Sequence, residues 1–137
     1  MSEIKIHIVA SNNPEAKKAK SNLSKLYKNY PVSRANVIVA LGGDGLMLQT
    51  LHDNIERELP IYGMNRGSIG FLMNNYNEKN LLKRIEKSTS TNLYPLKMKA
   101  KSKSKIYTAQ AINEVSLLRE TYQAAKLKIY IDGKERL

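Results

Sequence analysis

Residues 37–45 of the chain read Val-Ile-Val-Ala-Leu-Gly-Gly-Asp-Gly, and this stretch decides the fold. Its first five residues are all apolar, as in a parallel strand that is covered on both faces. The glycines allow a sharp bend, and Leu48, Leu51 and Ile55 then recur at helical spacing. A buried strand that leads through a glycine loop into a helix is typical of α/β proteins whose site lies at the carboxyl ends of the strands.

The sequence on both sides of this stretch continues the alternation of strand and helix. A strand is predicted at residues 4–9, and Asn13-Pro14-Glu15 then predicts the start of a helix. A third strand is predicted at residues 60–64, followed by a helix that Asn77 caps. The order β-α-β-α-β-α predicts a three-layer α/β domain with a parallel sheet, which occupies residues 1–92 and carries the glycine loops.

The pattern changes after the third helix. Alternating strands are predicted at residues 93–96, 106–118 and 124–131, and Asp132-Gly133 is a strong hairpin signal. Residues 93–137 are therefore predicted to begin an all-β, sandwich-type domain. Only four residues follow the turn, too few to complete a sheet, so we expect the domain to be incomplete. A truncated or split protein is expected, with a strand edge that favours pairing with another chain.

Composition narrows the classes of partner. The chain of 137 residues carries 23 Lys and Arg against 12 Asp and Glu, and a net charge of +11 favours anionic ligands such as nucleotides or polyphosphate. It has one Phe, no Trp and no basic stretch interleaved with aromatic residues, so nucleic-acid binding is not expected. The absence of Cys excludes disulfides and thiolate metal sites, and no apolar run approaches the ~18 residues of a membrane span. A cytoplasmic setting is expected.

The lysines at 97, 99, 101, 103 and 105 alternate strictly. A period of two places all five on one side of a strand. Such a stripe could attract ATP or polyphosphate, or it could form a solvated face that discourages sheet pairing. We favour the solvated face.

The first glycine loop, Gly42 to Gly45, is the strongest candidate site. Free N–H groups at the start of a helix favour anions, and glycines let a phosphate approach the main chain. A hairpin turn at Asp44-Gly45 is the alternative, but the residues that follow continue at helical spacing. Asp44 would repel a phosphate, so its carboxylate suits a base for a hydroxyl or a ligand for Mg²⁺. We assign no metal-ligand set, because His7 and His52 lack carboxylate neighbours at metal spacing.

Two further features stand out. A second glycine loop at residues 63–72 matches neither G-x-G-x-x-G nor the P-loop pattern, and its Phe71 could stack on a base or belong to the core. Asn113-Glu114 is a polar pair within an apolar strand, where at least one of the two side chains should point inward. A binding role for this pair and a strand whose acid faces solvent remain equally supported.

The three motifs together resemble those of NAD kinases. The Gly-Gly-Asp-Gly loop, the G-x-N-x-G-x-x-G-F-L pattern of residues 63–72 and Asn-Glu-Val at 113–115 occur in the family's order and approximate spacing. Diacylglycerol and sphingosine kinases and phosphofructokinases carry similar glycine–aspartate loops. The resemblance covers the whole chain, but it corresponds to only about the first half of a usual family member. The family's later Gly-Ser-Thr-Ala-Tyr-type loop is absent from this sequence.

The resemblance implies a transfer of phosphate to the adenosine ribose 2′-hydroxyl of NAD, which gives NADP, with ATP or polyphosphate as donor and Mg²⁺ as the metal. Asp44 resembles the general base. The implied binding residues are Gly42, Gly43, Asp44, Gly45, Gln49, Phe71, Asn113 and Glu114. Gln49 departs from the family, which often has a basic residue at this position.

The resemblance also implies homo-oligomers for full-length members, and a complementing chain is conceivable here. Weak or no activity is expected of these 137 residues alone. Two alternatives stay open: a lipid kinase that shares the glycine–aspartate loop, and a non-catalytic fragment that binds nucleotides or a partner.

Overall fold

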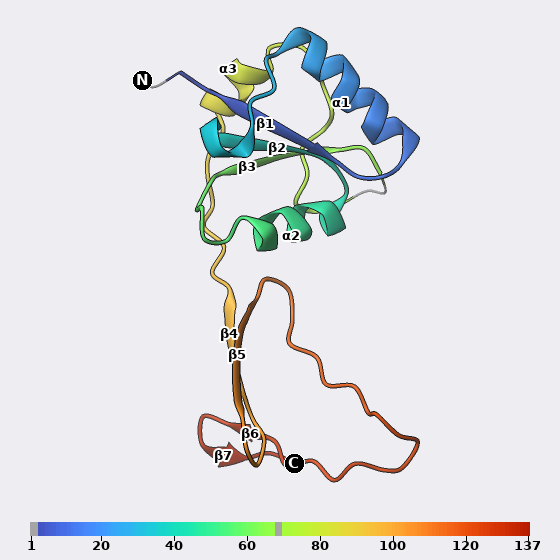
Figure 1. The fold of residues 1–137 in the computed structure, drawn as a ribbon, viewed down its shortest axis with the longest axis vertical. Helices are drawn as coiled ribbons and strands as arrows, with labels where there is room; N and C mark the ends of the chain where they lie inside the picture. The colour runs from blue at the N-terminus through green and yellow to red at the C-terminus, as the bar shows by residue number, and fades with distance from the viewer. Residues whose placement is uncertain (1–2, 68–69) are drawn as a thin grey trace.

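A computed structural model describes residues 3–67 and 70–137. Its centre is a three-stranded parallel sheet of β1 (Ile6–Ala10), β2 (Val37–Gly42) and β3 (Ile61–Asn65), in the order β1-β2-β3 (Figure 1). All six residues of β2 are buried. The central parallel strand predicted from its apolar run is therefore confirmed.

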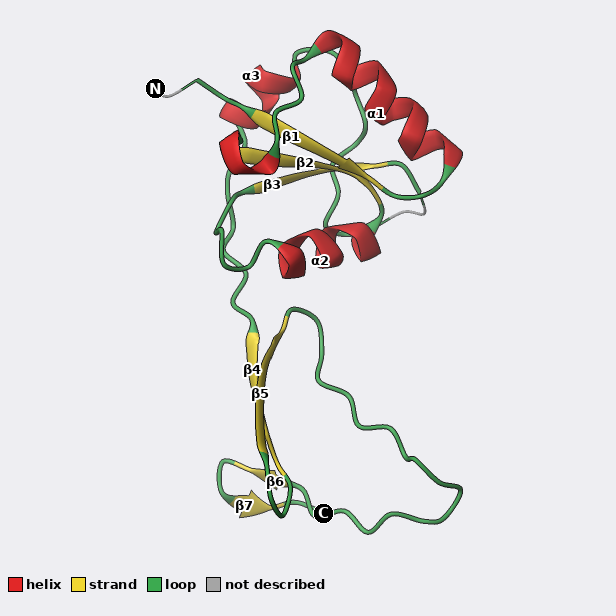
Figure 2. Cartoon of the chain, viewed as in Figure 1, coloured by secondary structure: helices red, strands yellow, loops and turns green. Residues whose placement is uncertain are grey.

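Helices cover both faces of this sheet. Figure 1 shows α1 (Pro14–Leu26) and α3 (Leu81–Glu86) over one face and α2 (Asp44–Asp53) over the other. The α/β arrangement with a parallel sheet is as predicted, and Figure 2 shows the helices confined to this half of the molecule. The core lies mainly between β1, β2, α1 and α3; its buried members are Ile6, Ile8, Ala19, Leu23, Val37, Val39, Leu41, Met64, Leu81 and Ile85.

The start of α1 follows the predicted capping pattern. Asn13 is the N-cap, and its Oδ1 accepts a hydrogen bond of 2.7 Å from the backbone N–H of Ala16. Pro14 is the first helical residue, where its missing N–H has no helical partner to lose. The helix buries Ala16, Ala19 and Leu23.

The buried face of α2 differs from the prediction. Met47 and Thr50 face the sheet, whereas Leu48 and Leu51 are half-buried and Ile55 lies beyond the end of the helix. Thr50 is tolerated there because its hydroxyl donates to the carbonyl oxygen of Leu46 at 2.7 Å. The apolar stripe thus gave the helix correctly but not its orientation.

The start of α3 was also predicted wrongly. Its N-cap is Asn80, in a left-handed conformation with φ 54°, and not Asn77. The Asn77 side chain instead accepts from the backbone N–H of Lys79 at 2.8 Å. Such a local bond stabilises a turn before the helix in place of its cap.

The strands after α3 are shorter than predicted. β4 (Leu96–Lys101) and β5 (Ile106–Ala111) form one antiparallel hairpin, and β6 (Tyr130–Ile131) and β7 (Lys134–Glu135) form another. The strands predicted at residues 93–96, 106–118 and 124–131 are therefore wrong in extent. No further layer covers these hairpins among the described residues, and Ile106 and Tyr107 are more than half exposed. Alternation alone does not form a strand where no neighbour pairs with it.

The predicted turn at Asp132-Gly133 is confirmed. Both residues have positive φ, 50° and 75°, as a two-residue turn that follows the strand twist requires. Across this hairpin the Tyr130 hydroxyl donates to Glu135 at 2.7 Å, and this hydrogen bond raises the pKa of Tyr130. The proposed domain boundary after residue 92 falls between α3 and β4 and stays a prediction.

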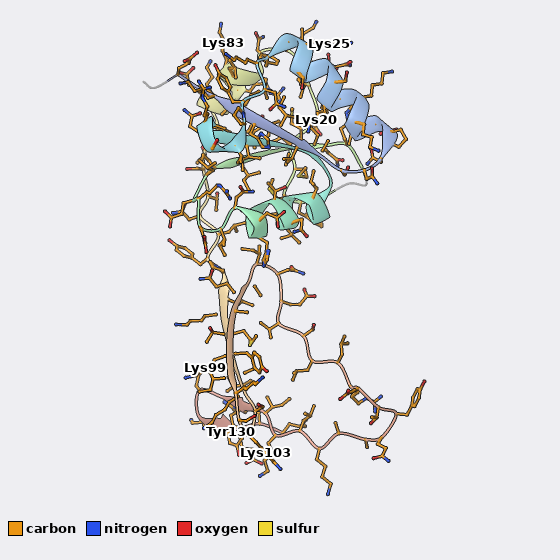
Figure 3. The ribbon with its side chains drawn as sticks, viewed as in Figure 1. Lys20, Lys25, Lys83, Lys99, Lys103 and Tyr130 are labelled. Atoms are coloured by element: carbon orange, nitrogen blue, oxygen red, sulfur yellow. The ribbon has the colours of Figure 1, made fainter. Side chains whose placement is uncertain are left out.

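The lysine stripe does not lie on one strand. Lys97, Lys99 and Lys101 belong to β4, but Lys103 and Lys105 follow its end. Figure 3 shows lysines on α1, α3 and the β4–β5 hairpin, so the positive charge is spread over the molecule. No helix of the described residues is long and apolar enough to cross a membrane.

The burial of Leu23 gives a test of this fold. Leu23→Ala should lower the free energy of unfolding by about 2–5 kcal/mol, because it leaves a cavity between α1 and the sheet. Leu26→Ala is the matched control, since Leu26 in the same helix is 59% exposed, and it should change that free energy by at most about 0.5 kcal/mol. Urea denaturation measures both, and equal effects would contradict the described packing.

Candidate functional site

The two glycine loops lie at the same edge of the sheet. β2 ends at Gly42 and leads through Gly43 into α2, while β3 ends at Asn65 and leads into the second loop. Because parallel neighbouring strands end at one edge, the loops that follow them meet there. Two residues of the second loop, 68 and 69, lie outside the described residues.

The loops are in direct contact. The backbone N–H of Arg66 donates to the carbonyl oxygen of Gly42 at 2.8 Å. A Cβ on Gly67 would lie 3.7 Å from the backbone nitrogen of Gly43, so the two main chains pass close to each other. Asn13, from the loop before α1, donates its amide to the carbonyl oxygen of Arg66 at 2.9 Å. The ends of all three strands thus meet at one place.

The second loop holds the carboxylate of Asp44. Asp44 is the first residue of α2 and is half-buried. Its Oδ2 accepts from the backbone N–H of Phe71 at 2.9 Å, and its Oδ1 accepts from that of Leu72 at 3.0 Å. A Cβ on Gly70 would lie 2.3 Å from Oδ1, so this approach requires glycine. The carboxylate is therefore fixed in direction by two consecutive amides.

An open cleft of about 360 Å³ lies beside this helix start. Four of the residues singled out from the sequence line it: Gly45 and Gln49 from α2, and Asn113 and Glu114 from the segment after β5. The space beside Gly45 is open, since a Cβ there would meet nothing within 4 Å. The structure thus brings together residues more than 60 positions apart in the sequence.

The remaining residues singled out from the sequence do not line this cleft. Asp44 and Phe71 lie beside each other at the loops, and the Phe71 ring is fully exposed, which rules out the core position considered for it. Gly42 is buried and Gly43 half-buried in the first loop. These four residues lie where the two glycine loops meet, beyond the carboxyl ends of β2 and β3.

The position of Asn113 and Glu114 corrects the sequence analysis. Both lie beyond the end of β5 at Ala111, and both are exposed, so neither points into a core. The Asn113 amide donates to the carboxylate of Glu114. The predicted inward-facing polar residue is therefore absent, because the strand that should have placed it ends earlier.

Some residues of the cleft were missed. His52 lines it together with Leu48 and with residues 110–112. His52 is exposed on α2, and it follows Gly45 and Gln49 at intervals of four and three, which places all three on one helix face. That spacing was the available signal. Gln49 itself donates to Asp53 at 2.7 Å.

A second cleft of about 430 Å³ continues from the first. It shares His52 and Gln110 with it and is further lined by Ile55, Lys97, Thr108 and Ala109. Of the five alternating lysines, Lys97 alone lines one of the two clefts.

A series of polar contacts connects the second loop to α1. The Arg66 guanidinium lies over the Tyr76 ring, 3.4 Å from its centroid, and the Tyr76 hydroxyl donates to Glu78 at 2.8 Å. Asn22 of α1 donates to the same carboxylate at 2.9 Å. Burial and the bond to Glu78 raise the pKa of Tyr76, while the hydrogen bonds from Asn22 and Tyr76 lower the pKa of Glu78.

Within residues 3–67 and 70–137 no three His, Asp or Glu side chains are placed to hold a metal ion together. Adjacent glycine loops at the carboxyl edge of a parallel sheet, with free N–H groups at a helix start, are features of α/β proteins that bind phosphorylated ligands.

Comparison with known proteins identifies the family. The ATP-NAD kinase N-terminal domain matches residues 5–93. The NAD kinase of Caulobacter vibrioides is 52% identical over 128 residues, which cover 93% of this chain and 49% of the relative. That of Zymomonas mobilis is 50% identical over 132 residues, 93% of this chain and 50% of the relative. That of Cereibacter sphaeroides is 48% identical over 138 aligned positions, 100% of this chain and 54% of the relative.

The chain therefore belongs to the NAD kinase family. It spans about half the length of the curated relatives it matches.

Gly70 provides a test of the contact between loop and carboxylate. Gly70→Ala should lower the free energy of unfolding by about 1.5–3 kcal/mol, because its methyl group would displace Asp44 from the two amides. Gly45→Ala should leave this free energy unchanged or raise it by up to about 1 kcal/mol, since the added methyl meets open space within a helix. Urea denaturation compares the two, and an equal loss in both would refute the contact.

Proposed function

We propose that this chain carries the NAD-binding and catalytic half of an NAD kinase. The reaction transfers a phosphoryl group from ATP or polyphosphate to the adenosine ribose 2′-hydroxyl of NAD. The observation that supports this most strongly is the cleft in which Gly45 and Gln49 face Asn113 and Glu114. Membership of the family supplies the reaction, and the cleft supplies a place for the dinucleotide.

The lining of the cleft suits a nucleoside. Its volume of about 360 Å³ lies within the ~300–1,000 Å³ range of small-molecule sites. The exposed carboxylate of Glu114 can accept hydrogen bonds from ribose hydroxyls, and the Asn113 amide can both donate and accept. The open approach to Gly45 lets a ligand contact its backbone. At the neighbouring loop, the free Phe71 ring offers a face on which adenine can stack.

Asp44 is the proposed general base. A carboxylate has about four lone-pair positions, and the amides of Phe71 and Leu72 occupy two of them. The remaining positions can accept the 2′-hydroxyl proton as that oxygen bonds to the transferred phosphorus and the donor's bridging P–O bond breaks. Fixing the carboxylate beforehand avoids the cost of orienting it during the reaction.

The first glycine loop is the proposed seat of the donor phosphates. Gly42 and Gly43 precede the N-terminus of α2, where the helix dipole and free N–H groups favour an anion. Asp44 carries the only carboxylate of the loop at Gly42 to Gly45, and it already accepts hydrogen bonds from two backbone amides. The residues of this loop alone therefore do not form a metal site. Mg²⁺ fits better as part of the donor complex, held by the phosphates it accompanies.

The finer features of the β region are proposals as well. Residues 93–137 would form part of a sandwich-type domain that the described hairpins only begin. Homo-oligomers, a complementing chain and a cytoplasmic setting stay predictions.

The two alternatives make different predictions. A lipid kinase would phosphorylate diacylglycerol and not NAD, and the family match disfavours it. A non-catalytic fragment would bind the nucleotide without forming product. Labelled phosphate donor, offered with NAD or with diacylglycerol to a protein that extends this sequence to the family's full length, separates an NAD kinase from a lipid kinase.

Binding of NAD is the first test. Titration of the ¹⁵N-labelled chain with NAD should shift the amide signals of Gly45, Gln49, Asn113 and Glu114 in a saturable way. Replacing Asn113 and Glu114 together by Ala should weaken binding, while Lys126→Ala, an exposed change in the same half, should not. The proposal fails if NAD leaves the four signals unmoved.

Asp44→Asn tests the chemistry. In a protein that extends this sequence to the family's full length, NADP formation should fall by about 10²–10⁴-fold, as expected for the loss of a general base. Circular dichroism should show an unchanged fold, since Asn still offers one oxygen to the second loop. A variant that forms NADP at the normal rate would remove Asp44 from this role. The 137-residue chain alone should form little or none.

A further inference from the structure

The side chain of Arg66 buries a hydrogen-bond donor that has no acceptor in the described part of the chain. Its Nε is buried and has no hydrogen-bond partner among the described residues. A donor buried in this way is costly, so the position of this side chain is not explained by its own hydrogen bonding. What the side chain does contact is the ring of Tyr76, at 3.4 Å from guanidinium carbon to centroid.

Arg66 lies in the second loop just after β3, and Tyr76 lies four residues beyond the last residue of the loop, Leu72. The base of the loop is closed by the bridge between Met64 and Asn74, with Asn65 N–H donating to the Asn74 carbonyl at 2.8 Å. Arg66 follows this bridge on one side and Tyr76 follows it on the other. The stacking of the cation on the ring therefore joins the start of the loop to the segment that follows it, in addition to the backbone bonds at its base.

We call the stacking of the Arg66 guanidinium on the Tyr76 ring the clasp. Both of its residues also make hydrogen bonds to the rest of the domain. The backbone of Arg66 bonds to Gly42 in the first loop and accepts from Asn13 before α1. The Tyr76 hydroxyl bonds to Glu78, which Asn22 of α1 also holds. Movement of the clasp would thus move the second loop relative to both the first loop and α1.

The second loop in turn holds Asp44. The amides of Phe71 and Leu72 lie between the two clasp residues in the sequence, and they contact both carboxylate oxygens. The guanidinium of Arg66 does not bond to this carboxylate in any contact of the structure. Its effect on Asp44 passes through the loop.

We propose that Arg66 is a positioning residue, whose stacking on Tyr76 clasps the second glycine loop and so keeps the Asp44 carboxylate directed by the amides of Phe71 and Leu72. The meaning for catalysis rests on the proposed function. The clasp itself does not depend on it and can be tested without NAD.

Amide hydrogen exchange in the ligand-free 137-residue chain tests the clasp. Arg66→Gln and Tyr76→Leu should each speed exchange at Phe71 and Leu72 by about 3- to 30-fold, the ratio that corresponds to one cation–π contact. Exchange in the buried strand, read at Val39, should stay unchanged. The ¹³C signal of the Asp44 carboxylate should shift in the same two variants.

Two further variants separate positioning from general stability. Arg66→Lys keeps a cation over the ring and should restore most of the protection at Phe71 and Leu72. Arg57→Gln removes an arginine that is exposed and makes only a backbone hydrogen bond. It should change neither the exchange rates of Phe71 and Leu72 nor the ¹³C signal of the Asp44 carboxylate.

The proposal is overturned if Phe71 and Leu72 exchange at the wild-type rate in folded Arg66→Gln. It is also overturned if Val39 speeds up equally, which would mean a merely structural role. If the clasp variants behave as expected but NAD binds nowhere, the proposed function fails and the clasp stands.

Discussion

The close approach of two main chains at the edge of the sheet is the constraint on which this site depends. The backbone of Arg66 bonds to Gly42. A side chain at residue 70 would push the second loop away from Asp44, whereas glycine there lets Phe71 and Leu72 reach the carboxylate. The contact exists because β2 and β3 are parallel neighbours that end together. Burial of β2 on both faces therefore fixes the site as well as the core.

The two halves of the chain differ in how their apolar side chains are covered. In the α/β half, helices bury the faces of the sheet, and the core closes around Leu23, Val39 and Leu81. After residue 93 the described hairpins pack against no layer of their own, and Tyr94, Leu118 and Tyr122 are largely exposed. The relatives are about twice as long, so this sequence covers about half of what the family uses.

Features that depend on short stretches of sequence were predicted well in both halves of the chain. The apolar run of β2, the cap at Asn13 and the turn at Asp132-Gly133 each depend on neighbouring residues, and the structure confirms all three. The buried face of α2 and the ends of β5 depend on what packs against them, which periodicity does not contain. That Gly45 and Asn113 belong to one site was predicted only from the resemblance to a family. The amides on Asp44 could not be foreseen, because backbone donors leave no trace in side-chain identity.

The two sides of the cleft differ in how they pack against the rest of the protein. One wall is α2, packed on the sheet, and the other is a segment of chain just after a thin hairpin. A molecule seated between them would act as a crosslink, and part of its binding energy would be spent on immobilising the weaker wall. By the same linkage, a bound ligand would stabilise the hairpin that carries this side of the cleft. Affinity in such a cleft measures the order of the protein as much as the fit of the ligand.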